Sequence, residues 1–147
     1  MEDQREKSKH IVFIDADAFV AFVKEDDANH QRAKELFIAL EGMSVEFYTS
    51  GYVFAEAVTV ISQKIDHETA VQFIDTVKSP DSAIQKLKDS TAIENTAIQF
   101  FREQTSKNIS FVDCINMAHM RLSGMEYIFS FDKAYRQNGF RTVEELI

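Results

Sequence analysis

Residues 11–20 read IVFIDADAFV, an apolar run that ends at one acid and meets a second acid two positions later. Residues 11–14 are all apolar and mostly branched, which is typical of a strand that is covered on both faces of its sheet. From Ala16 onward the apolar residues follow helical spacing. The stretch therefore predicts a buried strand followed directly by a helix, with Asp15 and Asp17 at the junction.

Strand and helix patterns alternate along the rest of the chain. Strands are expected at 11–14, 45–49, 83–88 and 127–131, with an edge strand in the tail 140–147, although 83–88 could also be the tail of a helix. Helices are expected between them, and two of these should begin with capping boxes, Thr91 with Glu94 and Ser110 with Asp113. This order predicts an α/β fold with a mainly parallel sheet covered by helices, whose sites form at the carboxyl ends of strands.

Composition limits the classes of protein that the chain can belong to. The 147 residues fit one domain, residues 1–147, in which residues 1–10 are expected to be a charged and flexible N-terminus. The chain has no apolar run long enough to span a bilayer and no signal peptide at its start, and its single cysteine, Cys114, fits a reducing cytoplasm. The net charge of −8 argues against a nucleic-acid partner unless some of the acids converge on cations.

Four acids lie at or near the expected strand ends. Asp15 and Asp132 each follow an apolar strand, Asp113 lies in the first turn of its helix, and Glu56 lies in a mostly apolar helix where its burial would be costly. Only the fold could bring them together, and a cluster of oxygen ligands suits Mg²⁺ or Mn²⁺. Each acid also has a structural alternative, as a helix cap or as a partly exposed charge.

The pattern resembles the PIN-domain ribonucleases, particularly the VapC-type toxins of toxin–antitoxin pairs. The matching pieces are VFIDADAFVAFV, YTSGYVFAEAVTVI, ISFVDCINMAHMRLSGMEYIFSFDKAY and NGF, in this order over roughly residues 11–143. The resemblance implies a three-layer α/β/α sandwich in which Asp15, Glu56, Asp113 and Asp132 are the catalytic and metal-binding acids. It also implies an accessory role for Ser130, an RNA substrate, an antitoxin partner and a homodimer.

Other residues near these motifs are open to two interpretations. Asp17 stands where the family often has a neutral polar residue, so it is either an extra ligand or a solvated acid in the first turn of a helix. Asn116 lies one helical turn after Asp113 and either orients a water or metal, or lies on the surface. Four cations near the site segments could contact phosphate or could simply be solvated: Lys133, Arg136, Lys107 and Arg102.

These features predict a Mg²⁺- or Mn²⁺-dependent endoribonuclease in which the acids hold the ions that activate water for attack on phosphorus. Two alternatives remain open. One is a non-catalytic PIN-like binding or scaffold module. The other is a haloacid-dehalogenase-like phosphatase with Asp15 as nucleophile, although Phe19 and the lack of a late pair of acids depart from that pattern. The four histidines show no zinc-binding spacing with Cys114.

Overall fold

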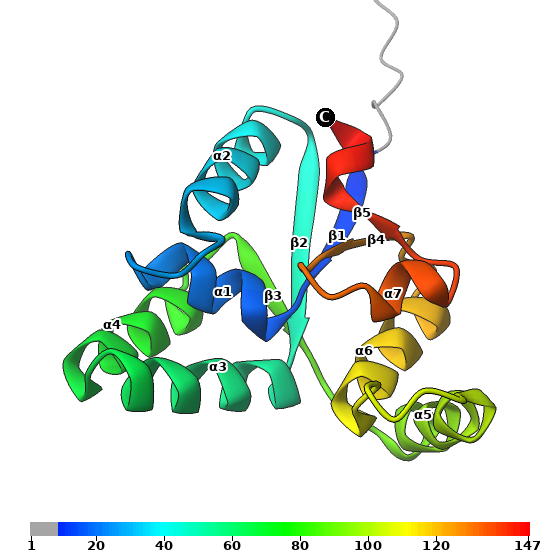
Figure 1. The fold of residues 1–147 in the computed structure, drawn as a ribbon. Coiled ribbons are helices and arrows are strands. Elements are labelled where there is room, and N and C mark those ends of the chain that lie inside the picture. The colour runs from blue at the N-terminus through cyan, green and yellow to red at the C-terminus, as the bar shows by residue number, and fades with distance from the viewer. Residues whose placement is uncertain (1–8) are drawn as a thin grey trace, which may run out of the picture.

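The computed structural model describes residues 9–147, which form a single parallel sheet with helices on both faces (Figure 1). Within these residues the five strands have the order β3-β2-β1-β4-β5, and every pairing is parallel. The prediction of a mainly parallel sheet is confirmed. The strands are β1 (His10–Ile14), β2 (Val45–Ser50), β3 (Ile84–Leu87), β4 (Tyr127–Phe129) and β5 (Arg141–Thr142).

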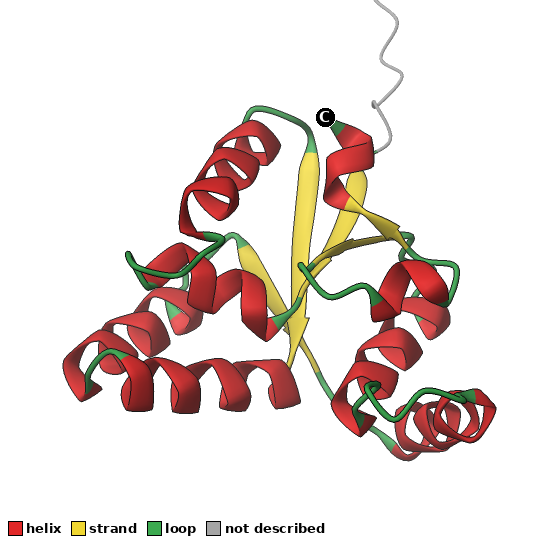
Figure 2. Cartoon of the chain, in the orientation of Figure 1, coloured by secondary structure: helices red, strands yellow, loops and turns green. Residues whose placement is uncertain are grey.

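The helices form two layers around this sheet, which confirms the expected α/β/α sandwich (Figure 2). One layer contains α1 (Ala16–Val23), α2 (His30–Glu41), α3 (Gly51–Lys64) and α4 (His67–Lys78). The other contains α5 (Thr91–Glu103), α6 (Phe111–Leu122) and α7 (Ala134–Gln137), and a 3₁₀ helix, η1 (Val143–Leu146), follows β5. No helix in the described part of the chain is long and apolar enough to cross a membrane.

The centre of the sheet is β1, and the connections change faces there. The helices α1 and α2 lead from β1 to β2, whereas α5 and α6 lead from β3 back to β4 on the other side of β1. In open parallel sheets such a switch point opens a crevice at the carboxyl ends of the strands. Asp15 follows β1 at this position, and its backbone N–H donates to the carbonyl oxygen of Phe129 at 3.0 Å.

Burial explains why residues 11–14 read as a covered strand. Val12, Phe13 and Ile14 are fully buried between the two helical layers, and all three residues of β4 beside them are buried as well. The apolar run ends where β1 reaches the carboxyl edge of the sheet, and Asp15 begins the turn into α1 there while remaining buried. Packing in the core fixes the position of β1, and the end of β1 fixes the position of Asp15.

Several expected boundaries differ from those in the structure. Ser90, rather than Thr91, is the N-cap of α5, because its Oγ accepts from the backbone N–H of Ile93 at 3.2 Å, so the expected Thr91–Glu94 capping box was wrong. The Ser110–Asp113 capping box is present. The strand expected at 127–131 ends at Phe129, and the edge strand in the tail has only two residues before η1 begins.

The segment expected to be flexible lies largely outside the described residues. Only Lys9 and His10 of residues 1–10 are described, and His10 already belongs to β1, so this strand starts one residue earlier than expected. Segment 83–88, which had two interpretations, contains strand β3. Its parallel pairing with β2 places the following loop at the same edge of the sheet as the end of β1.

Candidate active site

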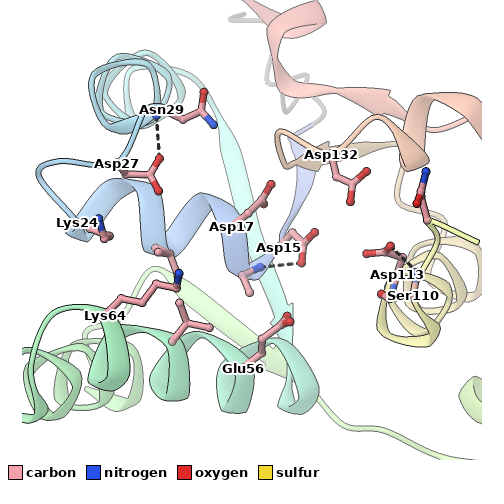
Figure 3. Close-up of a pocket in the computed structure, with 14 residues that line it drawn as sticks. Asp15, Asp17, Lys24, Asp27, Asn29, Glu56, Lys64, Ser110, Asp113 and Asp132 are labelled. Carbon is pink, nitrogen blue, oxygen red and sulfur yellow. Dashed lines mark hydrogen bonds between the residues drawn. The ribbon is translucent and has the colours of Figure 1, made fainter.

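A pocket of about 520 Å³ opens at the carboxyl edge of the sheet, and six carboxylates line it (Figure 3). Five of them come from four segments: the junction of β1 and α1, helix α3, the first turn of α6 and the loop after β4. These five are Asp15, Asp17, Glu56, Asp113 and Asp132, and the sixth, Asp27, lies between α1 and α2, where its Oδ1 accepts from the backbone N–H of Asn29 at 2.8 Å. The fold therefore brings all four predicted site acids, and the uncertain fifth one, to a single pocket.

Asp15 is the buried centre of this group. Its Oδ1 accepts hydrogen bonds from the backbone N–H of Ala16 at 2.7 Å and from Asn116 Nδ2 at 3.1 Å. Its Oδ2 accepts from the Tyr135 hydroxyl at 2.8 Å and from Ser130 Oγ at 3.2 Å. Asp15 is thus also the N-cap of α1, as the structural alternative proposed, but donors from two other segments bind the same carboxylate.

The electrostatic environment favours a proton on Asp15. Burial is the main cause that raises its pKa to about 7, and the negative charges of Asp17 and Asp113 add to the effect. The hydrogen bonds from Tyr135 and Ala16 act in the opposite direction but do not cancel it. A carboxylate in this position is stabilised by any cation that enters the pocket.

Asp17 belongs to the site rather than to the solvated surface. Its Oδ2 accepts from the backbone N–H of Phe131 at 2.8 Å and from Ser130 Oγ at 3.1 Å, which connects the start of α1 to the loop after β4. Its Oδ1 is buried and has no hydrogen-bond partner among the described residues. Burial raises the pKa of Asp17 to about 6, and the charge of Asp132 contributes.

Asp113 has both a structural and a site position. Its Oδ2 accepts from the backbone N–H of Ser110 at 3.0 Å as the acidic arm of the capping box, whereas its Oδ1 accepts from the Tyr135 hydroxyl at 3.3 Å. Burial is the main cause that raises the pKa of Asp113, and the charge of Asp132 adds to it. The two interpretations of this residue are therefore compatible, because each oxygen has its own partner.

Tyr135 and Asn116 hold the two buried acids together. The Tyr135 ring is fully buried, and its hydroxyl lies within hydrogen-bond distance of both Asp15 and Asp113 while it accepts from Asn116 Nδ2 at 2.9 Å. Burial and the neighbouring negative charges raise the pKa of Tyr135 well above its usual value, so the phenol remains a donor. Asn116 is fully buried, which excludes the surface position that was its structural alternative.

Sequence reasoning gave Tyr135 no role, although the residue lies inside one of the quoted motifs. Its position three residues after Asp132 places it on a short helix that turns back toward the strand ends. No local pattern distinguishes a tyrosine in that position from an ordinary core residue, so the sequence carried no signal for its role. Ser130, in contrast, was expected at the site, and its single hydroxyl proton lies between Asp15 Oδ2 and Asp17 Oδ2.

Glu56 and Asp132 form the solvent-exposed rim of the pocket. Glu56 is exposed, so the expected cost of burying it does not arise; partial desolvation and then the charge of Asp113 raise its pKa. Asp132 is also exposed, and its Oδ1 accepts from the backbone N–H of Ala134 at 2.9 Å, but the N-cap of α7 is Lys133, so Asp132 is not the helix cap that was its alternative. Both side chains have more freedom to move than the buried acids.

The donor set fits a hard divalent cation. All five candidate ligands are carboxylates, and the buried oxygen Asp17 Oδ1 lacks a partner. Within residues 9–147, however, no three histidine, cysteine or acidic side chains already surround one point closely enough to bind a metal ion. Binding would therefore require side chains to move toward the ion, and the exposed Glu56 and Asp132 are able to do so.

The cations that line the pocket are not the expected ones. Lys24 and Lys64 line it, whereas none of the four predicted phosphate contacts does. Arg136, for example, donates to Thr142 Oγ1 at 2.9 Å and pairs with Glu144 at 3.7 Å. Lys64 lies two turns after Glu56 along α3, so the helix presents an acid and a cation along the same wall.

Comparisons with known proteins agree with this architecture. The PIN domain family profile matches residues 12–141, which is most of the chain. The 23S rRNA-specific endonuclease VapC20 of Mycobacterium tuberculosis is 26% identical over 131 residues, which cover 88% of this chain and 95% of VapC20.

Solved structures show the same fold. The crystal structure of VapC20, described as a Sarcin-Ricin loop cleaving toxin, aligns with a TM-score of 0.78 and 23% identity over 88% of this chain and 95% of the other. VapBC2 from Rickettsia felis, bound to a DNA fragment from its promoter, aligns with a TM-score of 0.64 and 13% identity over 90% and 96%. A toxin–antitoxin complex from Klebsiella pneumoniae aligns at 0.58 and 13% identity over 83% and 87%. With its parallel sheet, its switch-point pocket and a family match over residues 12–141, the chain belongs to the PIN domain family.

Proposed function

We propose that this protein is a metal-dependent endoribonuclease and the toxin of a toxin–antitoxin pair. The observation that carries the proposal is the convergence of five carboxylates from four segments on one pocket, with burial and mutual repulsion raising the pKa of several of them. The repulsion among such buried acids destabilises the metal-free protein, and a bound cation compensates this repulsion. The similarity to VapC20 along most of both chains supports RNA as the substrate.

The metal would be held by Asp15, Glu56, Asp113 and Asp132, with Asp17 as a further ligand. When bound, Mg²⁺ or Mn²⁺ would supply charge neutralisation at the phosphate and would lower the pKa of water. Tyr135 and Asn116 orient the Asp15 carboxylate, and Ser130 links it to Asp17. These contacts fix the buried ligands before substrate arrives, so that less reorganisation is needed during the reaction.

Lys24 and Lys64 are suited to the RNA backbone that extends from the acids. Among residues 9–147 the Lys64 Nζ has no ion-pair partner, whereas Lys24 Nζ lies 2.6 Å from Asp26 Oδ1 on an exposed side chain. Phosphate binding depends on such cations, and the net charge of −8 makes their position important. The strand of RNA would enter along the wall formed by α3 and the end of α1.

The PIN domain match over residues 12–141 argues against the phosphatase alternative. Phe19 and the lack of a late pair of acids point the same way. An antitoxin that covers the pocket is part of the proposal and is supported by the similarity to toxin–antitoxin complexes. A homodimer is also proposed, as the family resemblance implies. A cytoplasmic location follows from an RNA substrate.

The test is cleavage of end-labelled RNA by purified protein. The first substrate is a sarcin–ricin stem-loop, chosen because VapC20 is described as cleaving that loop, and an unrelated stem-loop serves as the comparison. Cleavage is expected with Mg²⁺ or Mn²⁺, is abolished by chelation and is lost in Asp113→Asn. Asp75→Asn is the matched control, because Asp75 is an exposed acid on α4 that does not line the site. Unchanged cleavage by Asp113→Asn would refute the assignment of these acids to the active site. Folded wild-type protein that cleaves no RNA with either ion would favour the scaffold alternative.

A further inference from the structure

A second pocket, of about 340 Å³, lies beside the acidic one and is bordered by two exposed aromatic rings. It is formed by the first turn of α3, the segment that leads into α5 and the first turns of α6. Its lining residues are Tyr52, Asp89, Ser90, Ile93, Glu94, Phe111 and Ile115. Tyr52 is 50% exposed and Phe111 is 39% exposed, so both rings are accessible to a ligand.

Helices α3 and α6 contribute lining residues to both pockets. Phe111 directly follows Ser110, which lines the acidic pocket, and Tyr52 lies one helical turn before Glu56, which also lines it. The first two turns of α3 and the first turn of α6 therefore present acids to one pocket and aromatic rings to the next. A nucleotide whose phosphate lies among the acids would have its base within reach of the second pocket.

The chemistry of the second pocket favours a base over a phosphate. Asp89 and Glu94 line it and no lysine or arginine does, so a phosphate would be repelled. Ile93 and Ile115 supply apolar surface, while Phe101 packs edge-on against Phe111 with ring centroids 5.8 Å apart and orients that ring. Flat aromatic surfaces beside hydrogen-bond acceptors are the features that bind unpaired bases in RNA.

Asp89 is fixed in position to accept hydrogen bonds. Its Oδ1 lies 2.7 Å from Nε2 of the buried His119, and its Oδ2 lies so near Gly51 that an added Cβ atom would approach it to 3.0 Å. The side chain of Asp89 nevertheless remains 30% exposed. A base that presents N–H donors on its Watson–Crick edge could therefore reach an acceptor that is already oriented.

We propose that this pocket binds an unpaired nucleobase adjacent to the cleaved phosphodiester, stacked against Tyr52 or Phe111 with its N–H edge toward Asp89. The proposal rests on the proposed RNA cleavage and adds to it a reason for choosing one bond among many. It requires that the base next to the cleaved bond be free to leave its stack. RNA loops satisfy this requirement, whereas continuous duplexes do not.

The test compares KM for an RNA stem-loop that the protein cleaves with KM for the same RNA carrying an abasic residue on either side of the cleaved bond. Removal of the bound base should raise KM about tenfold at one of the two positions, and Tyr52→Ala or Phe111→Ala should raise KM for the intact RNA by a similar factor, as single stacking contacts do. The alanine variants should show no further increase with the abasic RNA, since both changes remove the same contact. Tyr52→Phe, which retains the ring, should remain close to wild type.

Phe22→Ala is the matched control, because Phe22 is 44% exposed on α1 and lines neither the acidic pocket nor the second pocket. Unchanged KM in both alanine variants would overturn the proposal. It would also be overturned if light scattering showed that the wild type is a dimer and the alanine variants are monomers, because the pocket would then be a subunit interface. If the wild-type protein binds RNA without cleaving it, the same comparison is made on Kd, so that failed catalysis does not conceal a failed base pocket. Absence of RNA binding would overturn this inference together with the proposed function.

Discussion

The substitution Asp15→Asn should stabilise the metal-free protein at high pH while it removes activity. The pKa of Asp15 is raised to about 7, whereas an unfolded chain leaves it near 3.8. Between these pH values the folded state holds a proton that the unfolded state has lost, so the stability of the wild type falls as pH rises and the full cost is present above pH 7. Asparagine does not ionise and does not carry this cost.

The size of this stability difference follows from the part of the Asp15 pKa shift that lies within the pH range of the unfolding experiment. From pH 5 to pH 7 the raised pKa spans about two units, and each unit corresponds to about 1.4 kcal/mol, so the cost grows by about 3 kcal/mol. The amide offers one acceptor oxygen where the carboxylate offers two, so part of the absolute gain is lost. This loss is the same at both pH values and cancels in the difference between them.

The assay is urea unfolding of both proteins in the presence of a chelator at pH 5 and pH 8. The free energy of unfolding of Asp15→Asn relative to wild type should increase by about 3 kcal/mol between the two pH values. Asp75→Asn should stay within about 0.5 kcal/mol of wild type at both, because Asp75 is exposed on the surface of α4. A difference between Asp15→Asn and wild type that does not change with pH would refute the account of a strained, buried carboxylate.

Two further predictions concern the residues around the acids. Tyr135→Phe keeps the buried ring but removes the hydroxyl between Asp15 and Asp113. Mn²⁺ affinity, measured by electron paramagnetic resonance, should fall about tenfold, as it does when partners of metal ligands are lost, while the far-ultraviolet circular dichroism spectrum changes little. Unchanged affinity would contradict this role of Tyr135. Lys64→Gln should raise KM for RNA and make its dependence on log salt shallower by about 0.7, as expected for one lost phosphate contact. Lys78→Gln, an exposed lysine on α4, should leave both quantities unchanged, and an equal effect of the two substitutions would show only the loss of net charge.

The sequence was sufficient for the architecture because periodicity and strand ends are local signals. The apolar run at 11–14 indicated a central strand, and its position in the sheet follows from burial on both faces. Asp15 and Asp132 could be placed at the sheet edge for the same reason. The exposure of Glu56 could not be predicted, since the face that a helix residue presents depends on the packing of the whole layer.

The network inside the site was beyond prediction because it joins residues far apart in the chain. Asn116 contacts Asp15 across 101 positions and Tyr135 contacts it across 120. No local pattern distinguishes such a tyrosine from an ordinary core residue, and helical spacing alone left Asn116 undecided between the surface and the site. The same limit explains why Lys24 and Lys64 were overlooked in favour of cations that are closer to the acids in sequence.

The most direct test of the central claim is a calorimetric titration of the metal-free protein with Mn²⁺ near pH 6, in two buffers with different ionisation enthalpies. If the acids form a cation site, binding must displace the protons that their raised pKa values retain, so the observed heat should differ between the buffers and indicate proton release. Asp15→Asn should bind more weakly and release fewer protons than wild type. Heats that are independent of the buffer, or wild-type protein that does not bind Mn²⁺, would contradict the assignment of these carboxylates to a metal-dependent active site.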